Sequence, residues 1–407
     1  MKEQMNCIVS MPKRYLVRNK RCKTFLNINR GTFRDNEAKL LPNASCLLQK
    51  TEWNEMKRSI PNFISIFIYC AGLVQTSEEM LKAWPLINLV ILFSVVDFSV
   101  VVITNFDISE LKINLTLLLA QIFSSVIYIL MRRKRKRLSI LLLKLQYLSP
   151  CTEERIFNLL MPVFSLIPLA AAITVTILCD KKIASTEYAF GIEVESYWAQ
   201  ITLIFFTDYI YFFTYPVFPG LIAVVYCTIC VRCSNSIRSL TRKISTYSPE
   251  KFGPLEQIQV LRYKAKIDEV LKITQEIFSA PSFCWIVASS VSCYSMLGMY
   301  LMSHLQGILL IEGASFGITS FLCLIVPLWI AGTLPVELNK LKETFYEKAY
   351  LRWISFKFLS EQNFRREILD KPDFTFTGCD IISFRRSSPF LIVGSLVTYT
   401  VLIISMP

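Results

Sequence analysis

Long runs of residues without charge constrain the fold of this chain more than any other feature. Seven such runs hold at most one charged residue each, and they are residues 84–105, 113–131, 156–178, 199–231, 277–303, 307–333 and 387–407. About 20 apolar residues cross the hydrocarbon core of a bilayer as a helix, which satisfies its own backbone hydrogen bonds there. The sequence therefore predicts an all-α, polytopic membrane protein with seven transmembrane helices.

The basic residues predict the orientation of these helices. With seven spans and a cytoplasmic N-terminus, the cytoplasmic segments are 1–83, 132–155, 232–276 and 334–386. These segments carry 41 of the 44 lysines and arginines, and the unbroken basic run from Arg132 to Arg137 is the strongest single signal. Because lysine and arginine are enriched in cytoplasmic loops, we expect the N-terminus inside the cell and the C-terminus outside.

One further apolar stretch, residues 59–77, is long enough to be considered a span, but it contains Pro61, Asn62, Gly72 and Gln75. If it crossed the membrane, the basic N-terminal arm would lie on the opposite side from the other basic segments. We therefore interpret it as an interfacial or re-entrant helix before the first span, and the sequence leaves open whether it crosses.

These runs divide the chain into four parts. The parts are a cytoplasmic arm near lipid head groups (1–58), the interfacial helix with spans one to six (59–333), a layer of cytoplasmic helices (334–386) and the seventh span (387–407). The fourth run, 199–231, would be about 50 Å long as one helix, so it must tilt, project into the cytoplasm or kink at Pro216 and Pro219. Apolar residues at helical spacing in 255–278 predict a cytoplasmic amphipathic helix leading into the fifth span.

The net charge of +13 belongs to the predicted cytoplasmic loops, so we expect no nucleic-acid partner. Cys227, Cys230 and Cys233 share one helical flank, but a metal site needs more ligands and no histidine is near. We interpret these cysteines as packing residues and expect no metal, no cofactor and no enzyme chemistry.

The seven-span layout, the basic run followed by the stretch 138–145, and several further stretches of the chain resemble the insect-type chemoreceptor superfamily and, within it, the gustatory receptors. Residues 374–384 are similar to the family segment that leads into the last helix, and Thr398-Tyr399 opens the family signature of Thr-Tyr, five hydrophobic residues, Gln and Phe. Here Ser405 and Met406 stand in place of Gln and Phe. The stretch 60–72 also resembles the apolar family segment that ends in glycine before the first span.

The resemblance implies a gustatory receptor that is a ligand-gated, non-selective cation channel of the plasma membrane, opened by a small-molecule tastant. It implies a homo- or hetero-tetramer with related receptors, in which the last helix of each subunit lines one central pore. It further implies a ligand pocket within each subunit, open to the outer side, among the second to sixth spans.

The residues that the family places at the gate correspond to Leu402 and Ser405, and Tyr399 shares their face at a spacing of three. A ring of leucines can close a pore by excluding water. Alternatively, Tyr399 and Leu402 pack against a neighbouring helix. Since serine offers only a hydroxyl where the family has a glutamine, conductance or selectivity is expected to differ.

Candidate pocket residues gather in the aromatic fourth run and the two runs after it. They are Asp208, Tyr209, Tyr211, Tyr215, Tyr294, Tyr300 and Glu312. An acid within a span usually faces a cavity or a partner, and an aromatic pocket with a carboxylate suits sugars or amines. Asp208 can equally lie among the outer head groups. We interpret Asp97 as making a structural hydrogen bond, and the lone His304 as a surface residue.

Two other classes of membrane protein have seven or more helices. A receptor coupled to a G protein places its N-terminus outside, against the distribution of basic residues, and neither an Asp-Arg-Tyr-like motif nor Asn-Pro-x-x-Tyr is present. A secondary transporter usually shows an internal repeat with broken helices, which this sequence lacks. The G-protein-coupled receptor is the alternative that we retain.

Overall fold

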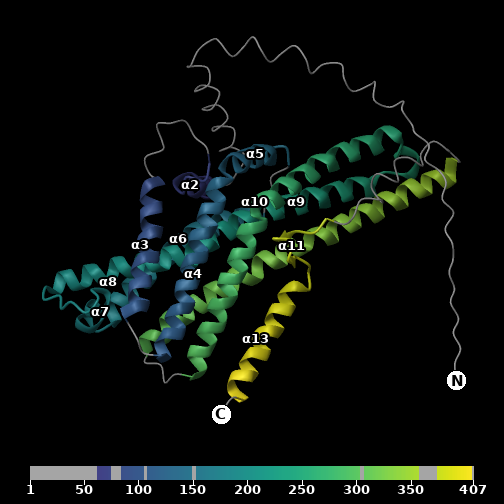
Figure 1. Cartoon of the computed structure of the whole chain (residues 1–407). Coiled ribbons are helices and arrows are strands. Elements are labelled where there is room, and N and C mark those ends of the chain that lie inside the picture. Colours follow the sequence, from purple (N-terminus) through teal and green to yellow (C-terminus); the bar gives the residue numbers. More distant parts are fainter. Residues whose placement is uncertain are drawn as a thin grey trace, which may run out of the picture. The chain divides into compact units, whose positions relative to one another are not determined.

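The computed structural model describes residues 62–74, 84–104, 108–148, 153–302, 307–356 and 374–405. The predicted arm 1–58 and His304 lie outside the described residues, as do residues 357–373 of the predicted cytoplasmic helices. The described part is helical apart from one short β-hairpin (Figure 1).

Each predicted run is helical over its described residues, apart from a break in the fourth run. The helices are α3 (Trp84–Thr104), α4 (Ile108–Arg133), α6 (Glu154–Leu178), α8 (Tyr197–Phe212), α9 (Phe218–Thr246), α10 (Pro254–Met302), α11 (Gly307–Phe356) and α13 (Ser388–Ser405). Among the described residues, five helical segments are long and apolar enough to span a membrane, and α3 and α13 contribute shorter apolar stretches. The protein is therefore an all-α, multi-pass membrane protein, whereas seven crossings and the sides of the two termini stay predictions.

Within the doubtful stretch 59–77, the described residues 62–74 contain one short helix, α2 (Asn62–Cys70). Nine helical residues are about 13 Å long, less than half of the hydrocarbon core. Gly72 ends the helix in the left-handed region, with Leu73 N–H bonded to Ile68 O at 3.0 Å and Gly72 N–H to Tyr69 O at 2.9 Å. Glycine adopts this conformation without steric cost, so the described helix is too short to cross and suits an interfacial or re-entrant position.

The fourth run breaks near its prolines, as its length predicts. A π-helical turn, η2 (Phe213–Val217), joins α8 to α9, and Tyr215 inside it has extended backbone angles. Beyond the break, every residue of α9 from Phe218 to Ser234 is buried, including the three cysteines. A helix that is apolar all round must be surrounded, and α4, α6, α10 and α11 pack around this one.

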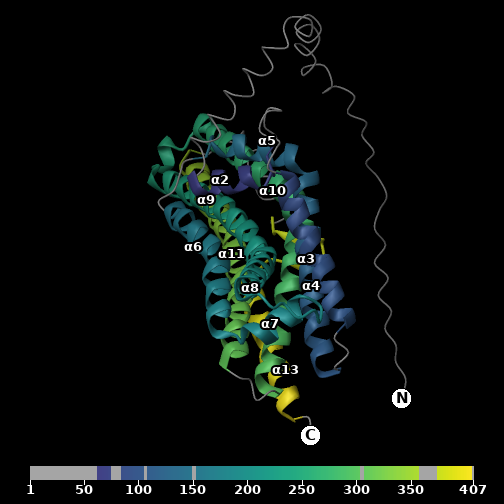
Figure 2. The same cartoon turned by 90° about the vertical axis from the view of Figure 1, so that its left-hand side faces the viewer.

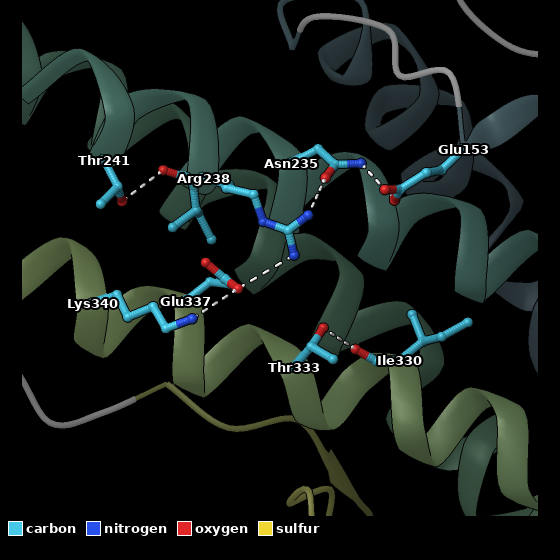
Figure 3. Close-up of polar contacts among 9 residues, drawn as sticks. Glu153, Asn235, Arg238, Thr241, Ile330, Thr333, Glu337 and Lys340 are labelled. Atoms are coloured by element: carbon cyan, nitrogen blue, oxygen red, sulfur yellow. Dashed lines mark hydrogen bonds and ion pairs between the residues drawn. The ribbon is translucent and has the colours of Figure 1, made fainter. Parts of the chain in front are cut away.

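The helices α10 and α11 are long and unbroken, so the predicted amphipathic segment and the fifth span form one continuous helix. Beyond the apolar part of α9, a polar seam joins α9 to α11 and to the residue before α6 (Figure 3). Arg238 bonds to Glu337 of α11 at 3.3 Å, and Asn235 donates to Glu153 at 3.0 Å. Lys340 lies 3.7 Å from the same Glu337 carboxylate.

Three short helices complete the described part: α5 (Arg135–Leu145), α7 (Lys181–Tyr188) and the 3-10 turn η3 (Pro249–Lys251). One residue, Lys134, separates α4 from α5, and α5 turns across the end of α4 (Figures 1 and 2). Four of its five leucines, Leu138, Leu141, Leu142 and Leu145, are buried and face the packed interior, where α5 contacts α10.

A β-hairpin precedes the last helix, where the sequence predicted only cytoplasmic helices. Its strands β1 (Thr377–Gly378) and β2 (Ile382–Ser383) are antiparallel. Cys379 and Asp380 make the turn in the left-handed region, and the Thr377 hydroxyl bonds to the Asp380 carboxylate at 2.8 Å. Phe376 and Phe384 are buried beside Tyr226 of α9, which anchors the hairpin to the central helix.

Candidate functional site

A cluster of polar side chains lies inside the helical bundle, where α3, α4, η2, α8, α10 and α11 meet. At its centre the Tyr211 hydroxyl on α8 donates a short hydrogen bond to Asp97 on α3. The ring of Tyr211 also packs edge-on against Phe98, with ring centroids 5.2 Å apart. The structural hydrogen bond predicted for Asp97 is therefore present, and it joins residues that are far apart in the sequence.

A second part of this polar cluster surrounds Tyr215, which is 1% exposed. Its hydroxyl lies 2.5 Å from the Ser292 hydroxyl and 3.2 Å from Ala288 O, both on α10, and 3.0 Å from the Ser320 hydroxyl on α11. One side chain at the break in the fourth run thus contacts both long helices. A change in the shape of the cluster would reach α10 and α11 through this hydroxyl.

The cluster continues onto α3 and α4. The hydroxyls of Ser94 and Thr214 are 2.9 Å apart, and Gln121 donates to Tyr211 O at 3.4 Å. The side-chain amide oxygen of Gln121, Oε1, is buried and accepts no hydrogen bond from any residue that the structure describes. Buried acceptors are nearly always satisfied, so this oxygen points to a donor from outside the part of the chain that the structure describes.

Asp208 is buried within the protein on α8, so its side chain is not exposed in the single chain. The Tyr188 hydroxyl at the end of α7 donates to its carboxylate at 2.7 Å, so α7 is tied to α8 beside the polar cluster. The cation of Lys181, at the start of α7, lies 5.8 Å from the ring centroid of Tyr197. Helix α7 therefore closes over the α8 side of the cluster.

The other predicted pocket residues lie elsewhere. Tyr209 is half-buried and stacks between Phe205 and Phe213, and Tyr300 is 63% exposed. The side chain of Glu312 is outside the described residues. Tyr294 contacts the last helix, as described next. Among the predicted residues whose side chains the structure describes, Asp208, Tyr211 and Tyr215 are the three that are buried in the region of the polar cluster.

Helix α13 packs on α10 and α11. The Tyr294 hydroxyl lies 2.8 Å from the Ser395 hydroxyl, and its ring packs edge-on against Tyr399, with centroids 4.7 Å apart. Leu402, one turn further along, is 49% exposed, and the side chain of Ser405 is outside the described residues. Tyr399 thus has the neighbouring-helix contact that was one of its two interpretations.

The hairpin before α13 is held by α10 through several hydrogen bonds. Gln275 donates to Thr377 O at 2.9 Å and to its hydroxyl at 2.6 Å, and it accepts from Thr377 N–H at 3.1 Å. Cys379 N–H bonds to the Ser279 hydroxyl at 3.0 Å. Since Ser292 on the same helix contacts Tyr215, α10 connects the polar cluster to the start of the last helix.

Sequence reasoning did not find Gln121, Ser292, Ser320 or Gln275. Single serines and glutamines in apolar helices are common, and nothing in their local sequence separates a cluster member from an ordinary packing residue. Polar residues inside a span generally face the protein interior. This general tendency was the only signal that the sequence offered for these four residues.

No protein-family model matches the chain and no curated protein matches it by sequence. Among solved structures, the insect olfactory receptor OR5 from Machilis hrabei matches with a TM-score of 0.62 at 11% identity, covering 89% of this chain and 99% of that one. The same receptor in complex with eugenol matches with a TM-score of 0.58 at 12% identity, covering 88% and 97%. This chain is thus an all-α, multi-pass membrane protein with the fold of the insect olfactory receptor OR5.

Proposed function

We propose that the chain is a chemosensory receptor of the plasma membrane, gustatory in type, that works as a ligand-gated, non-selective cation channel. The observation that carries this proposal is the OR5 fold, which extends over nearly the whole chain. The resemblance of Thr398-Tyr399 to the gustatory signature supports the taste assignment. The likeness to the OR5 fold also disfavours the alternative, a G-protein-coupled receptor.

The last helix is the proposed pore lining, and four copies of the chain are the proposed channel. Helix α13 packs on α10 and α11, while Phe390, Leu391, Val397 and Val401 are exposed in the single chain. Contiguous exposed apolar surface marks contact with lipid or with other subunits. In a tetramer around α13, Leu402 would form the closed ring.

The polar cluster around Asp97, Tyr211 and Tyr215 is the proposed ligand site. A structure of OR5 holds eugenol, which supports a small-molecule ligand for this fold. The cluster offers acceptors, the Asp97 carboxylate and the buried Gln121 Oε1, and so favours a ligand that donates hydrogen bonds. Amines and polyhydroxyl compounds such as sugars have this chemistry.

The experiment that tests the function is whole-cell recording from cells that express only this chain, with a panel of sugars, bitter compounds and amines. A prompt cation current that persists when G-protein signalling is blocked would support the channel. A response that disappears under this block would overturn it. If the surface-expressed chain is silent, co-expression with related receptors tests the hetero-tetramer.

Leu402→Ala is expected to raise the basal current severalfold, because a ring of small side chains no longer excludes water from the closed pore. The measurement is leak current before ligand, normalised to surface expression. Val401→Ala is the matched control, since Val401 is also exposed but lies on another face of α13. Equal leak in the two variants, or no increase with Leu402→Ala, would contradict a gate at this ring.

Asp97→Asn is expected to weaken responses to amines by roughly 10- to 100-fold, because a hydrogen bond to a charged group contributes about 1.5–3 kcal/mol. Asparagine can still accept from Tyr211, so the fold should be kept. The measurement is the ligand concentration for half-maximal current. Asp180→Asn, at an exposed acid before α7, should change nothing. An unchanged potency of every active ligand would place the site elsewhere.

A further inference from the structure

A stripe of exposed apolar side chains runs along α4 and ends at an arginine. Leu115, Leu119, Ile122 and Ile129 are each at least 40% exposed, and their spacing places them on one face of the helix. Arg133 follows Ile129 by one turn on that face and is also exposed. Because this segment of α4 is apolar enough to span a membrane, the stripe faces lipid tails and Arg133 lies at the level of the head groups.

Helix α5 begins at this corner and continues the pattern. Four of its leucines are buried, whereas Lys136 and Ile140, one turn apart on the opposite face, are exposed. No side chain caps the start of α5 at Lys134, and an N-terminus of this kind favours a negatively charged phosphate. The corner thus combines exposed cations, an uncapped helix start and an apolar surface beneath them.

Some of the nearby cations already have partners on α10. Lys134 donates to Glu276 O at 2.6 Å, Arg137 lies 3.1 Å from the Glu276 carboxylate, and Lys144 forms a short ion pair with Glu269. Burial, together with the charge of Arg137, lowers the pKa of Lys134 below its ordinary value. These contacts hold α5 against α10.

Arg132 of the same run interacts with Tyr128, and the other cations of the run are Arg133, Arg135 and Lys136. No carboxylate within the described ranges lies at ion-pair distance from any of the three. Clustered basic residues immediately after a membrane helix attract anionic lipids, at about 1 kcal/mol for each residue near the surface. Their charge is therefore complementary to a head group and not to another part of the described chain.

We propose that Arg133, Arg135 and Lys136 bind the phosphorylated head group of an anionic phospholipid whose acyl chains lie along the apolar stripe of α4. A bisphosphorylated phosphatidylinositol fits best, because several phosphates match several cations. The site lies in the cytoplasmic leaflet, which rests on the proposed orientation of the chain. Lipid binding itself requires no channel activity, so this proposal and the proposed function can fail separately.

The test is binding of fluorescent bisphosphorylated phosphatidylinositol to the purified full-length chain in uncharged detergent, followed by fluorescence polarisation. Replacing both Arg133→Gln and Lys136→Gln should weaken binding by about 30-fold, which corresponds to about 2 kcal/mol. Exchanging the two basic residues, as Arg133→Lys with Lys136→Arg, keeps both positive charges and should keep most of the affinity. Fluorescent phosphatidylcholine should bind equally to all variants.

The matched control is Arg242→Gln with Lys243→Gln, which removes the same charge from two exposed residues near the end of α9. This control should bind like the unchanged chain. Equal weakening in both pairs would overturn the site, since net charge alone would then explain it, and so would unchanged binding in the first pair. Soluble inositol phosphate that bound as tightly as the lipid would overturn the role of the α4 stripe.

Discussion

Replacing Glu154 with glutamine should destabilise the folded chain by about 3–5 kcal/mol, the usual cost of removing one partner of a buried ion pair. Arg232 of α9 bonds to both carboxylate oxygens of Glu154 at the start of α6, through Nε at 2.5 Å and through Nη2. The two side chains are only 4% and 5% exposed. The glutamine variant would leave the charge of Arg232 buried without this carboxylate.

The measurement is the melting temperature of the purified chain from tryptophan fluorescence. Glu153→Gln is the matched control one residue away, because Glu153 is exposed and accepts a hydrogen bond from Asn235 (Figure 3); its effect on the free energy of unfolding should stay within about 0.5 kcal/mol. Replacing the pair together, as Glu154→Leu with Arg232→Met, should recover much of the loss, since apolar substitutes for buried ion pairs are often tolerated. Equal melting temperatures for the two single variants would contradict the prediction.

Gly332→Ala should abolish most of the ligand-evoked current, because α11 touches the backbone before α13 at this residue. An added Cβ would lie 2.7 Å from Arg385 C and from Arg386 N, and backbone atoms cannot move aside as the end of a flexible side chain can. The chain must shift where it enters the last helix, at a cost of about 1–3 kcal/mol. Since α13 is the proposed pore lining, the shift should affect gating more than folding.

This second prediction is measured as peak current divided by surface expression, with melting temperature recorded in parallel. Gly317→Ala on the same helix is the control, since its Cβ would meet Met296 at an ordinary 3.5 Å. Gly394→Ala on α13 is a second control, with nothing within 4 Å. Normal current in Gly332→Ala, or equal loss in all three variants, would contradict a specific role for this contact.

The helices themselves could be predicted from the sequence because lipid imposes a simple rule on it. A segment such as 156–178 must be long, uncharged and helical, and the structure has α6 at Glu154–Leu178. The excess length of the fourth run required a tilt, a projection or a kink at its prolines, and the structure has the break at η2. The polar residues and Gly72 in 59–77 favoured an interfacial or re-entrant helix without excluding a crossing. These expectations depend on local features, so composition and spacing were sufficient for them.

The β-hairpin and the contacts that hold it against α9 and α10 could not be predicted in this way. Residues 374–387 lie in a segment expected to be helical, yet Thr377 bonds to Gln275 of α10 and Phe376 is buried beside Tyr226 of α9. Contacts between residues so distant in the sequence outweigh local preference, because a two-stranded hairpin has little stability of its own.

The sequence by itself determined that this chain is helical, where its apolar helices lie, and which segments carry its positive charge, since each of these depends on the side chains within one segment. Only the tertiary structure decided that Tyr211 reaches Asp97, that Tyr294 contacts α13 instead of the polar cluster, and that Arg232 pairs with Glu154. The physical reason is that a helix presents many faces of similar composition. Which face meets which neighbour is set by packing among all the helices at once.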